Sequence, residues 1–311
     1  MEYLPTESVL KIRSSAIEAV RKEVNLHRPG EMEEAVRILD EWIHQQPHYI
    51  YKEIPKPYLE STIVTNKGSV EKSKAMIDKL CTLRTLMPDQ FQPLDAEKAL
   101  KAVRDIAYMC FLPQQTEDYH RLIVIKTTVY TKELLHLFYK ASYMIVDYVR
   151  LYDYHAGVDV IYDLTDSDVK EALSVINFME FKDCYEIINH SYSLRVRRYI
   201  VITPSKWVEP LVNVFKTFMK KKIADRIMVL KDHTELYQFY TKDILPKEYG
   251  GDERSLKELQ DELFGHAASP KHREFREKLF EARTDETKRS PDAFSELYAG
   301  TTGTFRALTL D

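Results

Sequence analysis

The chain has 311 residues, of which 44% are hydrophobic and 30% are charged, as in folded globular proteins. This length predicts one large domain and a smaller one. The net charge of −4 argues against nucleic-acid binding, so attraction to an anionic surface would require a local basic patch. We find neither a secretory signal nor a run of roughly 18 apolar residues long enough to cross a bilayer. Cys81, Cys110 and Cys184 are widely separated, so we expect reduced thiols in a cytoplasmic protein.

The first 90 or so residues show only helical periodicity, with apolar side chains recurring every three or four positions. Pro47 ends one such pattern, and Gly68 followed by Ser69 supplies a stop and an N-cap for another. The predicted helices of this region span residues 8–24, 32–46, 58–64 and 70–87.

Beyond residue 95, short β-branched runs alternate with helical patterns, which predicts βαβ units and a mainly parallel sheet. The expected strands are 122–125, 158–164, 199–202 and 227–230, with an edge strand at 109–112. The expected helices are 95–106, 131–151, 168–188, 207–223 and 256–280. The last 25 or so residues form either an extended wrap or a loose end.

The fold class is therefore α/β, with a small helical domain preceding a sheet with helices. We place the helical domain at residues 1–94, the α/β domain at 95–283 and a C-terminal tail at 284–311.

The sequence lacks the motifs that carry common enzyme chemistry. It contains no Gly-x-Ser-x-Gly elbow, no Walker loop and no Gly-x-Gly-x-x-Gly phosphate cradle. His44 and His48 have the spacing of a helical metal pair, but Pro47 lies between them and breaks the helix. We therefore predict a binding fold that is not an enzyme and uses neither cofactor nor metal.

Three stretches carry a family resemblance. Residues 243–251 read Asp-Ile-Leu-Pro-Lys-Glu-Tyr-Gly-Gly, in which a proline stiffens a turn and two glycines permit positive φ. Residues 191–197 contain an Arg-x-Arg pair before a strand, and residues 215–219 read Phe-Lys-Thr-Phe-Met. Together they resemble the CRAL-TRIO (Sec14-like) lipid-binding family. Residues 83–88 and 303–308 resemble its arthropod branch near α-tocopherol transfer protein.

The resemblance implies an N-terminal CRAL-TRIO-N helical domain and a lipid-binding domain whose cavity is closed by a mobile lid helix. The chain also departs from the family pattern. Residues 63–69 contain no arginine where the family has an arginine-rich string, and Arg198 and Asp166 stand where glycines are common. The ligand and membrane partner of better-known relatives therefore do not transfer directly to this chain.

Residues 205–220 place their apolar side chains within an arc of roughly 160°, interrupted by Pro210 as a late first-turn residue or a kink. The resemblance makes this segment the lid. We expect the other cavity walls to come from strands and the two preceding helices, with Ser142 and the tyrosines as polar points. The candidate ligand-binding residues are Phe138, Ser142, Ile145, Tyr162, Phe178, Phe181, Tyr185, Ile188, Tyr192, Trp207, Val208, Leu211, Val212, Phe215, Phe218 and Met219.

The resemblance also implies a phosphoinositide site. Arg195 and Arg197 match the basic pair before the fourth strand, and Lys222 and Arg226 match the pair after the lid. The helical-domain arginine of the family has no counterpart, although Lys67 lies nearby in sequence. We expect Arg195 and Arg197 to face water. The four basic residues together would then bind an anionic membrane surface transiently.

Three functions remain open at this point. The first is a carrier for one hydrophobic small molecule, such as a tocopherol, retinoid, carotenoid or other isoprenoid. The second is an exchange protein for phosphatidylinositol or phosphatidylcholine. The third is an interaction module that senses a bound lipid and docks a protein partner.

Overall fold

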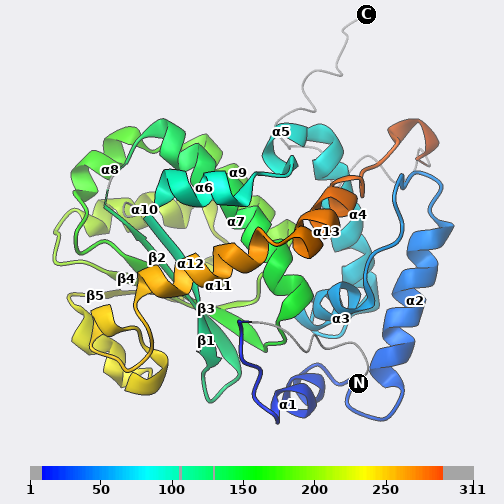
Figure 1. Cartoon of the computed structure of the whole chain (residues 1–311), viewed down its shortest axis with the longest axis horizontal. Coiled ribbons are helices and arrows are strands. Elements are labelled where there is room, and N and C mark those ends of the chain that lie inside the picture. The colour runs from blue at the N-terminus through cyan, green and yellow to red at the C-terminus, as the bar shows by residue number, and fades with distance from the viewer. Residues whose placement is uncertain (1–8, 105–106, 129, 290–311) are drawn as a thin grey trace, which may run out of the picture.

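The computed structural model describes residues 9–104, 107–128 and 130–289 (Figure 1). Its first part consists of helices, and its second part is a five-stranded sheet with helices, which confirms the predicted fold class. The tail motif at residues 303–308 lies outside the described residues. The helices before the sheet are α1 (Ala16–Glu23), α2 (Glu31–Gln45), α3 (Lys56–Thr65), α4 (Val70–Leu86), α5 (Pro88–Phe91) and α6 (Ala96–Val103).

The N-terminal helices pack around one apolar core, to which α1 contributes Val20 and α2 the stripe predicted from its periodicity. Ser69 caps α4 as expected, because its side chain accepts a hydrogen bond from the amide of Lys72. The prediction of a helix from residue 8 was wrong, since α1 begins only at Ala16.

The reason is that the segment before α1 is held along the sheet edge. The amide of Lys11 donates to the carbonyl of Pro113 at 2.9 Å, and Arg121 donates to the carbonyl of Lys11 at 3.1 Å. Arg121 is itself fully buried in a pair with Asp153, at 2.6 Å and 2.8 Å. These tertiary hydrogen bonds override the helical periodicity of the segment.

The sheet has the order β1-β2-β3-β4-β5, with β1 antiparallel to β2 and all other neighbours parallel. Each predicted strand is present, and the edge strand is longer than expected. The strands are β1 (Ala107–Gln115), β2 (His120–Thr127), β3 (Gly157–Asp163), β4 (Val196–Ile202) and β5 (Ile227–Leu230).

The two faces of the sheet meet different partners. One face carries Ile123, Val160 and Tyr199 and packs against α7 (Lys132–Tyr152) and α12 (Leu256–Ala267). The opposite face packs against residues 236–259, which contain the Leu-Pro-Lys-Glu-Tyr-Gly-Gly turn. Short helical turns shape this covering segment: η2 (His233–Gln238), η3 (Lys242–Ile244) and η4 (Lys247–Tyr249).

Three segments predicted as single helices are divided. Residues 168–188 form α8 (Val169–Val175) and α9 (Phe178–Glu186), followed by the π-helical turn η1 (Ile187–Ser191). Residues 207–223 form α10 (Val208–Phe218) and α11 (Lys221–Ala224).

The third division separates α12 from α13 (Pro270–Phe280). Asn177 and Ser269 explain two of the breaks, because each side chain caps a new helix and Pro270 starts α13.

The described end of the chain returns to the N-terminal helices, as Figure 1 shows for α13 and the segment after it. Thr284 pairs with Tyr49 in an isolated bridge, and the short turn η5 (Glu286–Lys288) follows. Arg289 then donates to both carboxylate oxygens of Asp78, at 2.9 Å and 2.8 Å, and to Thr82 at 2.8 Å. Most of the tail for which the sequence left two alternatives lies beyond residue 289, outside the described residues.

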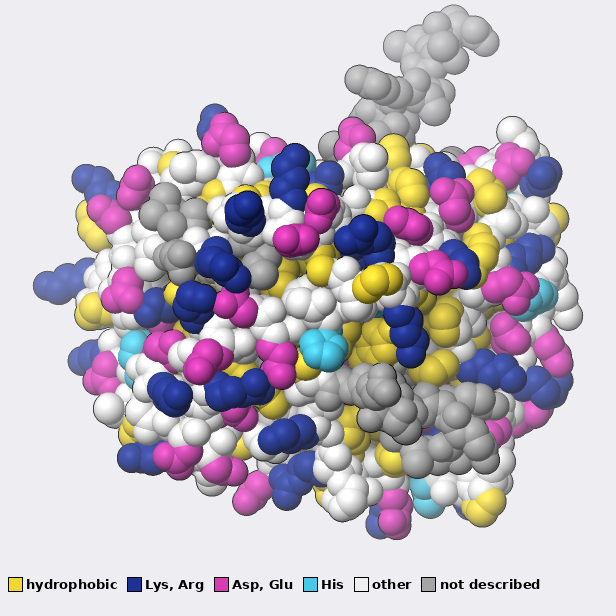
Figure 2. All heavy atoms as spheres, in the orientation of Figure 1, with side chains coloured by type: hydrophobic (Ala, Val, Ile, Leu, Met, Phe, Trp, Pro, Cys, Tyr) yellow, Lys and Arg dark blue, Asp and Glu magenta, His cyan; other side chains and the backbone are white. Residues whose placement is uncertain are grey.

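Charge is mixed over the surface. Figure 2 shows acidic and basic side chains interleaved across one face of the molecule. Within the described residues, no helix combines the length and the apolar character that a bilayer span requires.

Candidate functional site

An apolar cavity lies between the sheet face that packs on α7 and the lid helix α10. Its volume is ≈ 140 Å³. This is close to an apolar cavity of about 150 Å³ that holds one benzene molecule, so a larger ligand must displace part of the wall. Seven of the predicted residues line it: Phe138, Tyr162, Phe181, Leu211, Val212, Phe215 and Met219.

The remaining lining residues were missed from sequence. They come mainly from the strands, from α8 and from the first turns of α7, where a buried position gives no signal that distinguishes a cavity wall from packed core. They are Ile125, Thr127, Tyr130, Leu135, Tyr139, Leu164, Ala172, Ile176, Tyr199, Val201 and Ile227.

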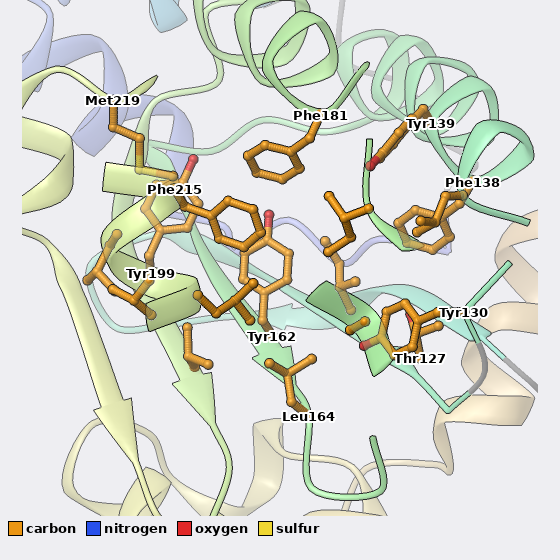
Figure 3. Close-up of a pocket in the computed structure, with 18 residues that line it drawn as sticks. Thr127, Tyr130, Phe138, Tyr139, Tyr162, Leu164, Phe181, Tyr199, Phe215 and Met219 are labelled. Carbon is orange, nitrogen blue, oxygen red and sulfur yellow. The ribbon is translucent and has the colours of Figure 1, made fainter. Parts of the chain in front are cut away.

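Helix α10, the predicted lid, packs beside the cavity through aromatic contacts. Phe215 of α10 stacks on Phe181 of α9 (Figure 3), with ring centroids 4.2 Å apart and planes at 22°. The ring of Phe178 lies 6.4 Å from that of Phe215. Pro210 occupies the first turn of α10, where an amide has no partner within the helix, so the lid begins there without losing a hydrogen bond. The contacts that hold α10 over the cavity are therefore mainly apolar.

Tyrosines supply the polar atoms of the wall. Tyr162 of β3 and Tyr199 of β4 stack with centroids 6.2 Å apart. The Tyr199 hydroxyl donates to Asn189 at 2.9 Å, and the Tyr130 hydroxyl donates to Ser167 at 3.2 Å. Burial raises the pKa of Tyr162 and of Tyr199, so these hydroxyls are neutral donors at neutral pH.

Several predicted ligand contacts do not line this cavity. Ser142 donates to the Phe138 carbonyl at 2.8 Å, and the Tyr192 hydroxyl lies 3.1 Å from Asp147 on α7. Trp207 is 51% exposed at the start of the lid. The side chain of Phe218 is outside the described part of the chain. The others pack in core clusters or beside the lid aromatics: Ile145, Phe178, Tyr185, Ile188 and Val208.

A basic cluster lies near the end of the lid. Arg195 and Arg197 flank the start of β4, and both donate to one carboxylate oxygen of Glu23 on α1, Arg195 at 2.8 Å. Arg226 donates to the Val196 carbonyl. The expectation that the arginines simply face water was wrong, because their side chains are only 12% and 27% exposed and Glu23 holds them.

The charges of the cluster act on one another. Burial acts to raise the pKa of Glu23, but the hydrogen bond from Arg197 and the charges of both arginines lower it overall. The charge of Lys222, followed by burial and the charge of Arg195, lowers the pKa of Lys67. The structure therefore places Lys67 of the helical region in the same electrostatic field as Lys222 and the arginine pair.

A tight turn positions Lys67. Lys67 and Gly68 both have positive φ, at 59° and 77°, and the amide of Gly68 donates to the Ile63 carbonyl at 2.9 Å to close α3. A Cβ on Gly68 would lie 2.3 Å from the Val24 carbonyl oxygen, so glycine allows α3 to end against the end of α1. The turn thereby brings Lys67 close to the cluster that Glu23 joins.

The three cysteines are free, with Cys81 and Cys110 buried. Burial raises the pKa of Cys81 to about 11 and that of Cys184 to about 12, so these thiols are protonated at neutral pH. Among the described residues, no three His, Cys, Asp or Glu side chains form a group that could hold a metal ion.

A comparison with known protein families matches the part of the chain that contains the sheet, α10 and the Gly-Gly turn. Residues 107–251 match the CRAL/TRIO domain family. In these residues the chain resembles a CRAL/TRIO domain. The structure described as "Crystal structure of Sfh5" has a TM-score of 0.41 and 13% identity, covering 81% of this chain and 93% of that chain.

Proposed function

We propose that the chain is a carrier that holds one hydrophobic small molecule in the lidded cavity and transfers it to membranes, without catalysis. A CRAL/TRIO domain implies a hydrophobic lipid ligand, and the observation that carries the proposal is the apolar cavity behind α10. An apolar wall with a few placed polar groups is typical of sites for hydrophobic ligands. A tocopherol, retinoid, carotenoid or similar isoprenoid has the matching chemistry.

The lining favours such a molecule over a phospholipid. None of the described residues that line the cavity is charged, and its polar atoms are hydroxyls. A buried phosphate without a cationic or multiply hydrogen-bonding partner is strongly disfavoured. Exchange of phosphatidylinositol or phosphatidylcholine is therefore the second candidate.

The basic cluster supports delivery to an anionic surface. Guanidinium groups donate paired hydrogen bonds to phosphate oxygens, and each basic residue near an anionic membrane contributes about 1 kcal/mol. Arg195, Arg197, Lys222 and Arg226, joined by Lys67, have the composition of a phosphoinositide site. In this proposal the protein works in the cytoplasm, binds membranes peripherally and does not bind nucleic acid.

The first experiment identifies the ligand. The protein is purified without detergent, extracted with organic solvent and examined by mass spectrometry, and we expect one isoprenoid-like molecule per chain. A stoichiometric diacyl phospholipid would replace the carrier proposal with phospholipid exchange. A protein that extracts no hydrophobic molecule but keeps a tight protein partner would favour a lipid-sensing interaction module.

The second experiment tests the surface. Lys67→Gln with Lys222→Gln removes two exposed charges without breaking the pair between Glu23 and the arginines. We expect roughly tenfold weaker binding to vesicles containing phosphoinositide, since two basic residues contribute about 2 kcal/mol at most. Lys98→Gln with Lys101→Gln on α6 is the matched control. Equal loss in both double variants would show a nonspecific charge effect.

A further inference from the structure

Four tyrosines line the cavity, and their hydroxyls fall into two groups. Those of Tyr130 and Tyr199 are used by the protein, through Ser167 and Asn189 respectively. Those of Tyr139 and Tyr162 form no hydrogen bond with any described residue. The second pair therefore contributes donors that the protein does not use.

The two unused hydroxyls belong to positioned, largely buried rings. Tyr139 of α7 is only 9% exposed, and Tyr162 of β3 is fixed by its stack on Tyr199. Figure 3 shows the Tyr162 ring standing in the middle of the pocket, with its hydroxyl end toward Phe181 and Phe215.

Their surroundings make an unpaired hydroxyl costly. The side chains that line the cavity with the two phenols carry no charge and few polar atoms, and a stably bound water needs two to four polar partners. A buried hydroxyl without any partner is strongly disfavoured, so such groups are normally hydrogen-bonded. Phenylalanine would fill the same space without this penalty, so the hydroxyls indicate a partner that comes with the ligand.

We propose that the ligand carries a hydroxyl or carbonyl oxygen that accepts a hydrogen bond from Tyr162, with Tyr139 as a second polar contact. The inference rests on the proposed carrier function and narrows it, because pure hydrocarbons are then excluded as preferred ligands. Tyr162 thus determines specificity by leaving a buried donor unpaired when the wrong molecule enters.

The test uses alcohols paired with hydrocarbons of the same skeleton: retinol with anhydroretinol, farnesol with farnesene, and hexadecanol with hexadecane. Each pair is offered at equal amounts from neutral vesicles, and the protein-bound ratio is measured by mass spectrometry. We expect wild type to favour the alcohol of the best-binding pair by roughly 5- to 100-fold, the range for one buried hydrogen bond.

Tyr162→Phe keeps the ring and removes the hydroxyl. We expect its alcohol-to-hydrocarbon ratio to fall to within about threefold of unity, because the alcohol loses a partner and the hydrocarbon no longer strands a donor. Tyr237→Phe is the control, since that hydroxyl donates to the Tyr249 carbonyl and the residue does not line the cavity, and its ratio should match wild type.

Two outcomes distinguish a failure of the tyrosine inference from a failure of the carrier function. If the pairs bind but Tyr162→Phe and Tyr139→Phe both keep the wild-type ratio, the inference is overturned and the carrier function stands. If no member of any pair binds, the small-molecule carrier proposal fails and the inference fails with it.

Discussion

Replacing Glu23 by glutamine should strengthen binding to anionic membranes. The Glu23 carboxylate occupies the arginine pair that the proposal assigns to headgroup phosphate, so it competes with that phosphate. Glutamine keeps the shape and removes the charge. The change is equivalent to adding one positive charge to the cluster, or about 1 kcal/mol, which is roughly fivefold in affinity.

The fold should tolerate this change. Glu23 is 38% exposed, and an ion pair with that much solvent contributes no more than about 1 kcal/mol to stability. The docking of α1 depends instead on buried Ala16 and Val20. We therefore expect the melting temperature of Glu23→Gln to stay within a few degrees of wild type.

The assay is co-sedimentation with vesicles containing phosphoinositide, measured over a series of salt concentrations. The gain should shrink as salt rises, because charges separated by more than about 8 Å are screened at 0.15 M. Glu18→Gln, an exposed change on the same helix, is the control and should bind like wild type. If Glu23→Gln binds no better than Glu18→Gln, the carboxylate does not compete with phosphate.

Three further predictions concern the lid, the C-terminal wrap and a buried histidine. Trp207→Ser with Met179→Ser removes two exposed apolar side chains, at 51% and 57%, and should weaken vesicle binding with no loss of thermal stability, whereas Phe215→Ser should lower both. Arg289→Ala removes the charged donor from Asp78, which keeps the hydrogen bonds of His48 and Tyr49, and should cost about 2 kcal/mol in urea unfolding, against no measurable change for exposed Lys288→Ala. Burial lowers the pKa of His272 to about 3, so between pH 6.5 and 3 the unfolded chain binds a proton that the folded chain does not. The contribution of His272 to the free energy of unfolding should therefore fall by up to about 1.4 kcal/mol per pH unit as the pH drops from 6.5 toward 3. His272→Phe keeps the ring packing and should flatten that slope, and an unchanged slope would show that other groups cause it.

The elements predicted from sequence depended on local signals that tertiary contacts mostly respected. The strands predicted at 158–164 and 199–202 are present in the structure. They could be predicted because parallel strands that are buried on both faces have nearly continuous apolar sequences. The helix predicted over residues 8–24 failed where hydrogen bonds to Pro113 and Arg121 hold its first half extended. Such contacts join residues about one hundred positions apart, so periodicity does not report them.

The site was predictable where an element presents one face and unpredictable elsewhere. The lid arc supplied Leu211, Val212 and Phe215 because helical periodicity shows which side is apolar. Tyr199 was missed although Tyr162 was predicted: both line the cavity from the same face of the sheet, and the sequence of a strand does not show which of its positions border a cavity. The Asn177 cap before Phe178 was readable and would have divided the long predicted helix.

The clasp between Arg289 and Asp78 has a consequence for synthesis. Asp78 and Thr82 leave the ribosome some two hundred residues before the arginine that binds them. Chains are made at about 5–20 residues per second, so the N-terminal helices wait on the order of ten seconds or longer for their last partner. During that interval His48 and Tyr49, which precede Asp78 in the chain, can already hydrogen-bond to its carboxylate. The first part of the chain to be made is thus among the last to be completed, and truncation before Arg289 would leave the newborn helical region permanently at that earlier stage.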